Sequence, residues 1–164
     1  MLTLKLKIAL RVFRPGACLC LALLVLLALA SQAPASQSQG IRWLSYDQIL
    51  EQGPKAGKPV LLFFHAPWCA VCKKTQHLVF PDPQFRAYLN KRFLAGQVDV
   101  TKEEAVAKLY GINYLPSFVF LDEQGKPLFL LRGYFTSDRL LKALRFVADG
   151  HYRKMSFQAF EDKN

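Results

Sequence analysis

One stretch, FFHAPWCAVCKK at residues 63–74, organises the chain. The apolar run at residues 60–64 predicts a buried strand, which breaks at Ala66-Pro67. Two cysteines separated by two residues follow at the predicted start of a helix. This spacing puts Cys69 at the helix N-terminus, where unpaired backbone N–H groups and the helix dipole favour a thiolate, and Cys72 one turn inside. Cys-x-x-Cys at a strand-to-helix junction is typical of a redox-active dithiol.

A second motif, GINYLPSFVF at residues 111–120, supports this interpretation. Together with Trp68 before the first cysteine, the two motifs resemble the thioredoxin superfamily. The resemblance implies an α/β thioredoxin fold, with a mixed central β-sheet flanked by helices. The second motif is similar to the family's cis-proline segment, with Leu115-Pro116 as the cis peptide. The resemblance extends from residue 58 to about residue 144.

Two segments that flank the cysteine motif indicate a particular branch of the superfamily. They are KAGKP at residues 55–59 and FPDP at residues 80–83. They are similar to the periplasmic C-terminal domain of the membrane disulfide-interchange protein DsbD and to its free-standing relatives. The tail after residue 150 resembles that of exported thioredoxins associated with sulfur oxidation. Its apolar residues are expected to pack back on the domain.

The resemblance implies a role for each of five site residues. Cys69 is expected to be the more exposed, attacking nucleophile, and Cys72 the shielded, resolving thiol. Trp68 is expected to cover the pair, although a plain core tryptophan is an alternative. Pro116 is expected to fix the neighbouring loop, and Leu115 to hold a substrate strand by main-chain hydrogen bonds. No cofactor is expected beyond the redox-active disulfide itself.

Two positions depart from the family pattern. Relatives carry a buried acid six residues before the first cysteine, where this chain has Phe63, and the nearer relatives carry a glutamate where it has Gln76. Both proton acceptors outside the motif are therefore missing. Water, or else His65 or His77, must take the proton that Cys72 releases when it resolves a mixed disulfide.

The first thirty residues have the order of a secretory signal peptide. Residues 1–14 carry four basic side chains and no acid, residues 17–30 are apolar apart from two cysteines, and small residues precede position 31. The apolar run is shorter than the ~20 residues that span a bilayer. Cleavage is expected near Ala30, with residues 33–35 as a second site. An uncleaved anchor and a lipoprotein attached through Cys18 are the alternatives.

Cleavage would leave Cys69 and Cys72 as the only cysteines. Two cysteines three positions apart close too short a loop to stabilise a fold much, so we interpret the pair as chemical. A buried structural pair or half of a zinc site is the alternative. Zinc needs two more ligands, and the three histidines do not lie at a recognisable zinc spacing, so no metal site is predicted.

The charge balance argues against nucleic acid as a partner. The signal segment holds four of the 22 Lys and Arg and none of the 12 Asp and Glu, so a formal charge of +10 falls to +6 after cleavage. No long basic run or aromatic-interleaved basic patch remains, and nucleic-acid binding is not expected. The positive surplus would favour acidic partners or anionic surfaces.

Four segments are expected: a signal peptide over residues 1–30, a disordered leader over 31–40, a thioredoxin-like domain over 41–150 and a C-terminal extension over 151–164. The predicted strands and helices of the domain alternate. The strands are expected at 41–44, 60–64, 93–100, 117–121 and 127–131, and helices after Ser45, Cys69 and Asp82 and at 102–110 and 138–147.

These observations predict a periplasmic or secreted thiol–disulfide oxidoreductase that acts on protein thiols and disulfides. Reduction is favoured over oxidation because the resemblance is to an electron-delivering domain, and an upstream membrane or exported electron donor is expected. Contact with the membrane is expected only through the signal peptide before cleavage. Two alternatives of other classes are a metallochaperone that binds copper(I) through Cys69 and Cys72, and a non-catalytic docking module of thioredoxin fold.

Overall fold

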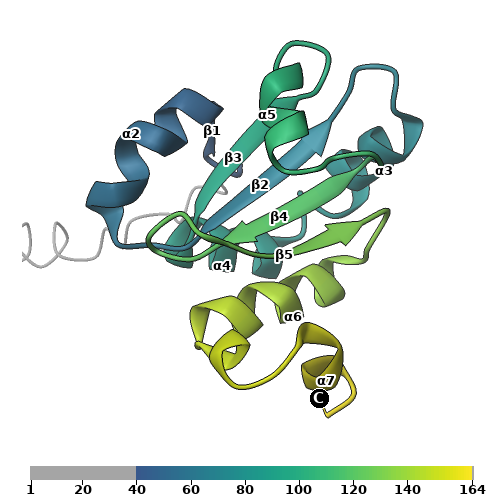
Figure 1. The fold of residues 1–164 in the computed structure, drawn as a ribbon. Coiled ribbons are helices and arrows are strands. Elements are labelled where there is room, and N and C mark those ends of the chain that lie inside the picture. Colours follow the sequence, from purple (N-terminus) through teal and green to yellow (C-terminus); the bar gives the residue numbers. More distant parts are fainter. Residues whose placement is uncertain (1–39, 164) are drawn as a thin grey trace, which may run out of the picture. The chain divides into compact units, whose positions relative to one another are not determined.

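The computed structural model describes residues 40–163, which form a five-stranded sheet with helices on both faces (Figure 1). The predicted signal peptide and residues 31–39 of the leader lie outside the described residues. The strand order is β1-β3-β2-β4-β5, in which the first three strands are parallel and the last two antiparallel to their neighbours. The predicted α/β class with a mixed central sheet is therefore confirmed. The strands are β1 (Trp43–Leu44), β2 (Val60–His65), β3 (Leu94–Asp99), β4 (Ser117–Leu121) and β5 (Pro127–Arg132).

Two helical layers enclose the sheet. Helices α2 (Tyr46–Ala56) and α5 (Glu104–Leu109) pack on one face. Helices α3 (Ala70–Leu78), α4 (Pro83–Arg92) and α6 (Ser137–Ala148) pack on the other. The central strand β2 supplies side chains to both cores, since successive residues point to opposite faces. Among residues 40–163, no helix combines the length and the apolar character needed to cross a bilayer.

Local signals in the sequence define most helix ends. Ser45 and Gln48 form the predicted capping box of α2, and Gly57 ends that helix in the left-handed conformation. Asp82 caps α4, and Pro83 is its first residue, as predicted.

Helix α5 begins at Glu104, two residues later than predicted. The Asp99 carboxylate accepts hydrogen bonds from the backbone N–H and the hydroxyl of Thr101, at 3.0 and 2.7 Å. The Asp99 carbonyl oxygen accepts the backbone N–H groups of Lys102 and Glu103. These bonds hold the chain in a turn, which delays the helix.

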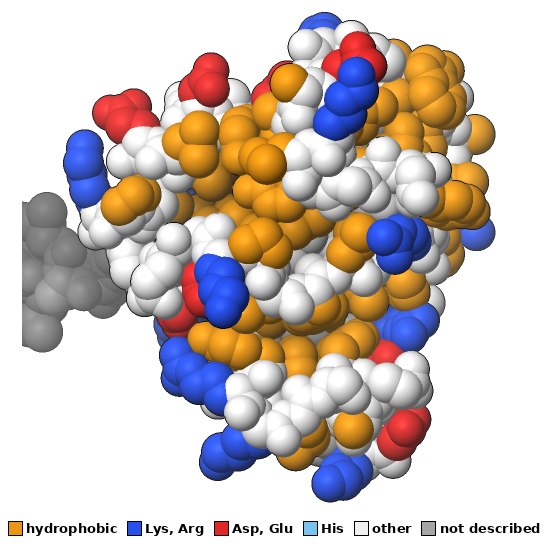
Figure 2. All heavy atoms as spheres, viewed as in Figure 1, with side chains coloured by type: hydrophobic (Ala, Val, Ile, Leu, Met, Phe, Trp, Pro, Cys, Tyr) orange, Lys and Arg blue, Asp and Glu red, His pale blue; other side chains and the backbone are white. Residues whose placement is uncertain are grey.

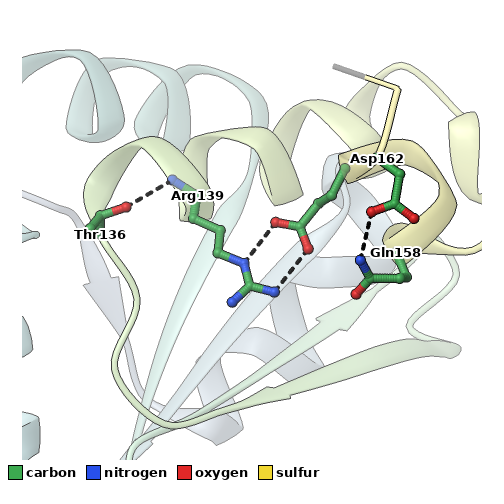
Figure 3. Close-up of polar contacts among 5 residues, drawn as sticks. Thr136, Arg139, Gln158 and Asp162 are labelled. Atoms are coloured by element: carbon green, nitrogen blue, oxygen red, sulfur yellow. Dashed lines mark hydrogen bonds and ion pairs between the residues drawn. The ribbon is translucent and has the colours of Figure 1, made fainter.

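The C-terminal extension packs against the layer that contains α6. It consists of the 3₁₀ helix η1 (His151–Arg153) and the helix α7 (Phe157–Glu161). The buried ring of Phe157 stacks on Phe129 with centroids 5.3 Å apart and meets Phe146 edge-on at 5.4 Å. Arg139 on α6 forms a two-pronged ion pair with Glu161, at 2.7 and 2.8 Å (Figure 3). The expected packing of the tail is thus present.

Gly96 in β3 allows α2 to approach the sheet closely. A Cβ atom at this position would lie 2.6 Å from Cδ2 of the fully buried Leu62 and 3.0 Å from Cγ1 of Ile49 on α2. We expect Gly96→Ala to lower the free energy of unfolding by about 1–3 kcal/mol, the usual range for overpacking. Gly53→Ala on α2 is the control, because nothing lies within 4 Å of its added Cβ. Urea unfolding of both variants measures the difference, and a Gly96→Ala protein as stable as the wild type would contradict it.

Candidate active site

The cysteine pair lies where β2 leads into α3. Cys69 is the N-cap residue of α3, and its Sγ accepts the backbone N–H of Cys72 at 3.1 Å. The backbone N–H of Cys69 donates to the Ala66 carbonyl oxygen at 3.1 Å, which closes the turn before the helix. Cys69 and Cys72 form a disulfide bond. The sequence therefore placed both cysteines correctly at the helix start.

The two cysteine side chains differ little in exposure in the disulfide form. Cys69 is 6% exposed and Cys72 is 1% exposed. The expected order, with Cys69 the more exposed, is present by a small margin, because the buried Ala66 and the first turn of α3 enclose the pair. Cys69 still differs from Cys72 in one respect, since Cys69 lines a surface groove.

This groove has a volume of about 520 Å³ and carries no charged side chain in its lining. Trp68, which is 71% exposed, and Tyr114, which is 57% exposed, are its two aromatic members. The alternative of a core tryptophan is thus excluded. Hydrophobic side chains gather on this side of the molecule, near α3 and α5 (Figure 2). The full lining is Trp68, Cys69, Ala70, Val71, Val100, Ile112, Asn113, Tyr114 and Leu115.

The loop before β4 forms the part of the groove opposite the helix. The peptide bond between Leu115 and Pro116 is cis. The Ser117 hydroxyl donates to the Tyr114 carbonyl oxygen at 2.7 Å, and the Gly133 backbone N–H donates to the Pro116 carbonyl oxygen at 2.8 Å. Within residues 40–163, the Leu115 backbone makes no hydrogen bond. The structure thus brings together Trp68, Cys69 and Leu115 in one groove, with Pro116 adjacent and Cys72 beneath.

Aromatic rings surround Phe63, the position at which the family resemblance implies a buried acid. Phe63 is fully buried, and its ring lies 4.9 Å from that of Phe80, 5.3 Å from that of Phe118 and 5.9 Å from that of Trp43. Gln76, at the second departure from the family pattern, is half-buried on α3. This ring cluster belongs to the same core as both cysteines, so their surroundings are apolar.

His65 is the histidine that contacts this ring cluster. Its imidazole stacks on Phe63, with centroids 5.4 Å apart and planes 12° from parallel. The side-chain amide of Gln97 donates to Nε2 of His65 at 2.8 Å. Burial lowers the pKa of His65 below its ordinary value of 6.5, and Lys102 lowers it further, while Asp99 acts in the opposite direction. The neutral ring is therefore the favoured form, which suits an accepting Nε2.

The lowered pKa of His65 predicts a pH-dependent stability. The unfolded chain binds a proton on His65 more tightly than the folded chain does. The contribution of neutral His65 to folding stability is therefore complete above pH 6.5 and is lost as the pH falls below that value. We expect His65→Asn to lose less stability than the wild type between about pH 7.5 and pH 5.5. His77→Asn, at an exposed position on α3, is the control. Urea titrations at several pH values test this, and equal slopes for His65→Asn and the wild type would refute it.

Several site residues were not singled out from the sequence. Val100, Ile112, Asn113 and Tyr114 line the groove, and the last three lie within the proline motif at residues 111–120, which was the available signal. Gln97 pairs with Phe63 in the β2–β3 register, and no local pattern marks it. For metals, reduced Cys69 and Cys72 would be the available thiolate donors. In the part of the chain that the structure describes, no three His, Cys, Asp or Glu side chains are grouped to hold a metal ion.

Proteins of known class are similar to this chain in sequence and in fold. A family model described as a thioredoxin-like domain matches residues 46–148, more than half of the chain. The thiol:disulfide interchange protein DsbD of Vibrio vulnificus (strain YJ016) is 34% identical over 104 residues, which cover 59% of this chain and 17% of DsbD. DsbD of Escherichia coli (strain K12) is 36% identical over 95 residues, or 54% and 17% of the two chains. This chain thus spans about a sixth of the DsbD sequences.

Solved structures agree with this relationship. The solution structure of a thioredoxin from Thermus thermophilus matches with a TM-score of 0.61 at 28% identity, covering 66% of this chain and 88% of that one. A structure named DsbH Oxidoreductase matches with a TM-score of 0.60 at 21% identity, covering 74% and 97% of the two chains, and so supports the fold alone. The chain belongs to the thioredoxin-like family of thiol–disulfide oxidoreductases, with Cys69 and Cys72 as its CXXC pair.

Proposed function

We propose that the protein is exported and reduces disulfide bonds of partner proteins through Cys69 and Cys72. The observation that carries this proposal is the position of Cys69, at the helix N-cap and on the groove beside the Leu115–Pro116 loop. The Cys69 thiolate attacks a partner disulfide and forms a mixed disulfide. Cys72 then attacks the Cys69 sulfur, which releases the reduced partner and leaves the Cys69–Cys72 disulfide. An upstream dithiol must reduce that disulfide again.

The groove suits an extended segment of a partner protein. The free backbone groups of Leu115 offer main-chain hydrogen bonds to such a segment, and the exposed rings of Trp68 and Tyr114 offer it apolar contact within the groove. The uncharged lining favours an apolar segment over a highly charged one.

Two arguments favour reduction over oxidation. The first is the resemblance to an electron-delivering domain. The second is that strongly oxidising dithiols depend on a highly stabilised thiolate. Among residues 40–163, the Cys69 sulfur accepts one hydrogen bond, from the Cys72 N–H, and the Cys69 residue is 6% exposed in a groove lined by uncharged side chains. Such surroundings stabilise a thiolate only modestly, which leaves the disulfide form comparatively favoured and the dithiol a good electron donor.

A pair of opposite reactions tests the direction. In the first, the reduced protein is mixed with insulin, and loss of insulin disulfides is followed. In the second, the oxidised protein is mixed with a reduced, unfolded protein that needs disulfides. We expect the first reaction to be faster at equal concentrations, and a faster second reaction would reverse the proposed direction.

Export is tested by the mature N-terminus. The basic, apolar and small-residue order of residues 1–30 supports cleavage near Ala30 and accumulation in the periplasm or outside the cell. Mass spectrometry of the protein from fractionated cells should show a chain that begins near Ser31. An intact N-terminus in a cytoplasmic fraction would contradict export, without bearing on the dithiol chemistry.

A further inference from the structure

The two helical layers of the domain differ in charge. The three helices on one face of the sheet carry eight basic residues and one acidic residue, whereas the two helices on the other face carry two basic and three acidic residues. Figure 2 shows acidic side chains among a few Lys and Arg over α2 and α5, and several Lys and Arg among fewer acidic side chains around the lower half, which contains α6 and α7. The basic residues of the first layer are Lys73, Lys74, Arg86, Lys91, Arg92, Arg139, Lys142 and Arg145.

Helices α4 and α6 lie side by side in this layer and form what we call the basic face. Its members are Arg86, Lys91, Arg92, Lys142 and Arg145. Guanidinium groups from both helices converge on one ring, since Arg92 lies 5.8 Å and Arg145 5.9 Å from the centre of Tyr88. Arg92 also contacts Asp149 at 3.5 Å, between side chains that are more than 40% exposed, so this ion pair neutralises little. In the described part of the chain, the other four make no ion pair.

The basic face lacks the exposed apolar and aromatic side chains that usually anchor a protein partner. Protein interfaces gain most of their affinity from buried aromatic and apolar side chains at their centre. The large apolar side chains exposed among residues 40–163 lie on α2, α3 and α5 and in the loops of the groove, and none lies on α4 or α6. A diffuse cationic surface of this kind suits a flat, polyanionic partner, to which each nearby Lys or Arg adds attraction.

The start of the described chain lies on the same layer. The Asn90 amide on α4 donates to the Gly40 carbonyl oxygen at 3.1 Å, and its side-chain oxygen accepts the Arg42 backbone N–H at 3.1 Å. The chain therefore enters the domain beside the basic face. The apolar segment at residues 17–30, which is expected to direct the chain to a membrane, is separated from Gly40 by nine residues.

We infer that the basic face binds the anionic headgroups of a membrane surface, independently of the dithiol chemistry. Bound in this way, the domain would place its α4–α6 layer toward the lipid. The groove, with its exposed Trp68 and Tyr114, is built from other elements and would stay available to partner proteins. The attraction would be electrostatic and therefore sensitive to salt.

Co-sedimentation with lipid vesicles tests this inference, with the protein purified in the form that its producing cells accumulate. The probes are vesicles of phosphatidylglycerol and vesicles of phosphatidylcholine. We expect binding to the first and none to the second, with loss of binding at high salt. The variant Lys142→Gln/Arg145→Gln removes two charges of the basic face and should weaken binding about thirtyfold. The variant Lys55→Gln/Lys108→Gln removes two charges of the α2–α5 layer and should weaken binding less than about twofold.

Three results would overturn the inference. One is the absence of phosphatidylglycerol binding, and another is equal binding to both lipids. The third is equal weakening by the two double variants, which would show that net charge alone matters. Binding to soluble polyglutamate without binding to vesicles would instead favour an acidic protein partner. Unchanged insulin reduction in both double variants keeps this test separate from the proposed reductase function.

Discussion

Cys69→Ser is expected to abolish disulfide exchange, whereas Cys72→Ser is expected to stop it after one step. Cys69 lines the groove and its sulfur accepts the Cys72 N–H at the start of α3, so its thiolate is the one that partners can reach. Cys72 is 1% exposed and lies beneath it. Without Cys69, insulin reduction should fall to the uncatalysed rate.

Without Cys72, mixed disulfides with partner proteins should accumulate on Cys69. Non-reducing electrophoresis and mass spectrometry detect them, and Cys69→Ser is the matched control because it retains one cysteine of the pair. Alkylation of the reduced wild type at mildly acidic pH should also label Cys69 first. A Cys69→Ser protein that accumulates more mixed disulfide than the Cys72→Ser protein would reverse these roles.

Phe63→Asp is expected to cost much stability and to accelerate the resolving step. Phe63 is fully buried and contacts the rings of Phe80, Phe118 and Trp43, so truncation should lower the free energy of unfolding by at least about 3 kcal/mol. A carboxyl group buried there would have a raised pKa. Stability would then fall as the pH rises above the ordinary aspartate range, because the folded state favours the protonated acid.

The same carboxylate could accept the proton that Cys72 releases as it attacks the mixed disulfide. In the wild type, we expect the rate of this step to follow ionisation of the Cys72 thiol, without a carboxylate step in its pH profile. Phe63→Asn is the matched control, since it makes the same cavity and does not titrate. Stopped-flow resolution of a preformed mixed disulfide compares the three proteins under conditions where each is folded. A carboxylate-like step in the wild type, or equal profiles for Phe63→Asp and Phe63→Asn, would refute this proton path.

The sequence predicted those parts of the fold that depend on neighbouring residues. The capping box at Ser45, the Asp82-Pro83 helix start and the N-cap position of Cys69 all follow from residues within one helical turn. The buried strand at β2 follows from its continuous apolar run. The cysteine pair and the proline loop could be predicted together because each carries its own motif.

Features that depend on strand register could not be predicted in this way. Gln97 and His65 are 32 residues apart, and only the pairing of β2 with β3 brings their side chains together. The close approach of Leu62 to Gly96 depends on the same pairing. The exposure of Trp68 was also open, because an aromatic residue before a helix can face either the core or the solvent.

The reduction potential of the Cys69–Cys72 couple tests the proposed reductase function most directly. The fraction of oxidised protein is measured by alkylation after equilibration in a series of glutathione buffers. We expect a potential more negative than about −200 mV, toward the value of about −270 mV found for thioredoxin, because the Cys69 thiolate is stabilised only modestly. A potential near −120 mV, typical of the strong oxidant DsbA, would show that the protein introduces disulfides and would contradict the proposed direction.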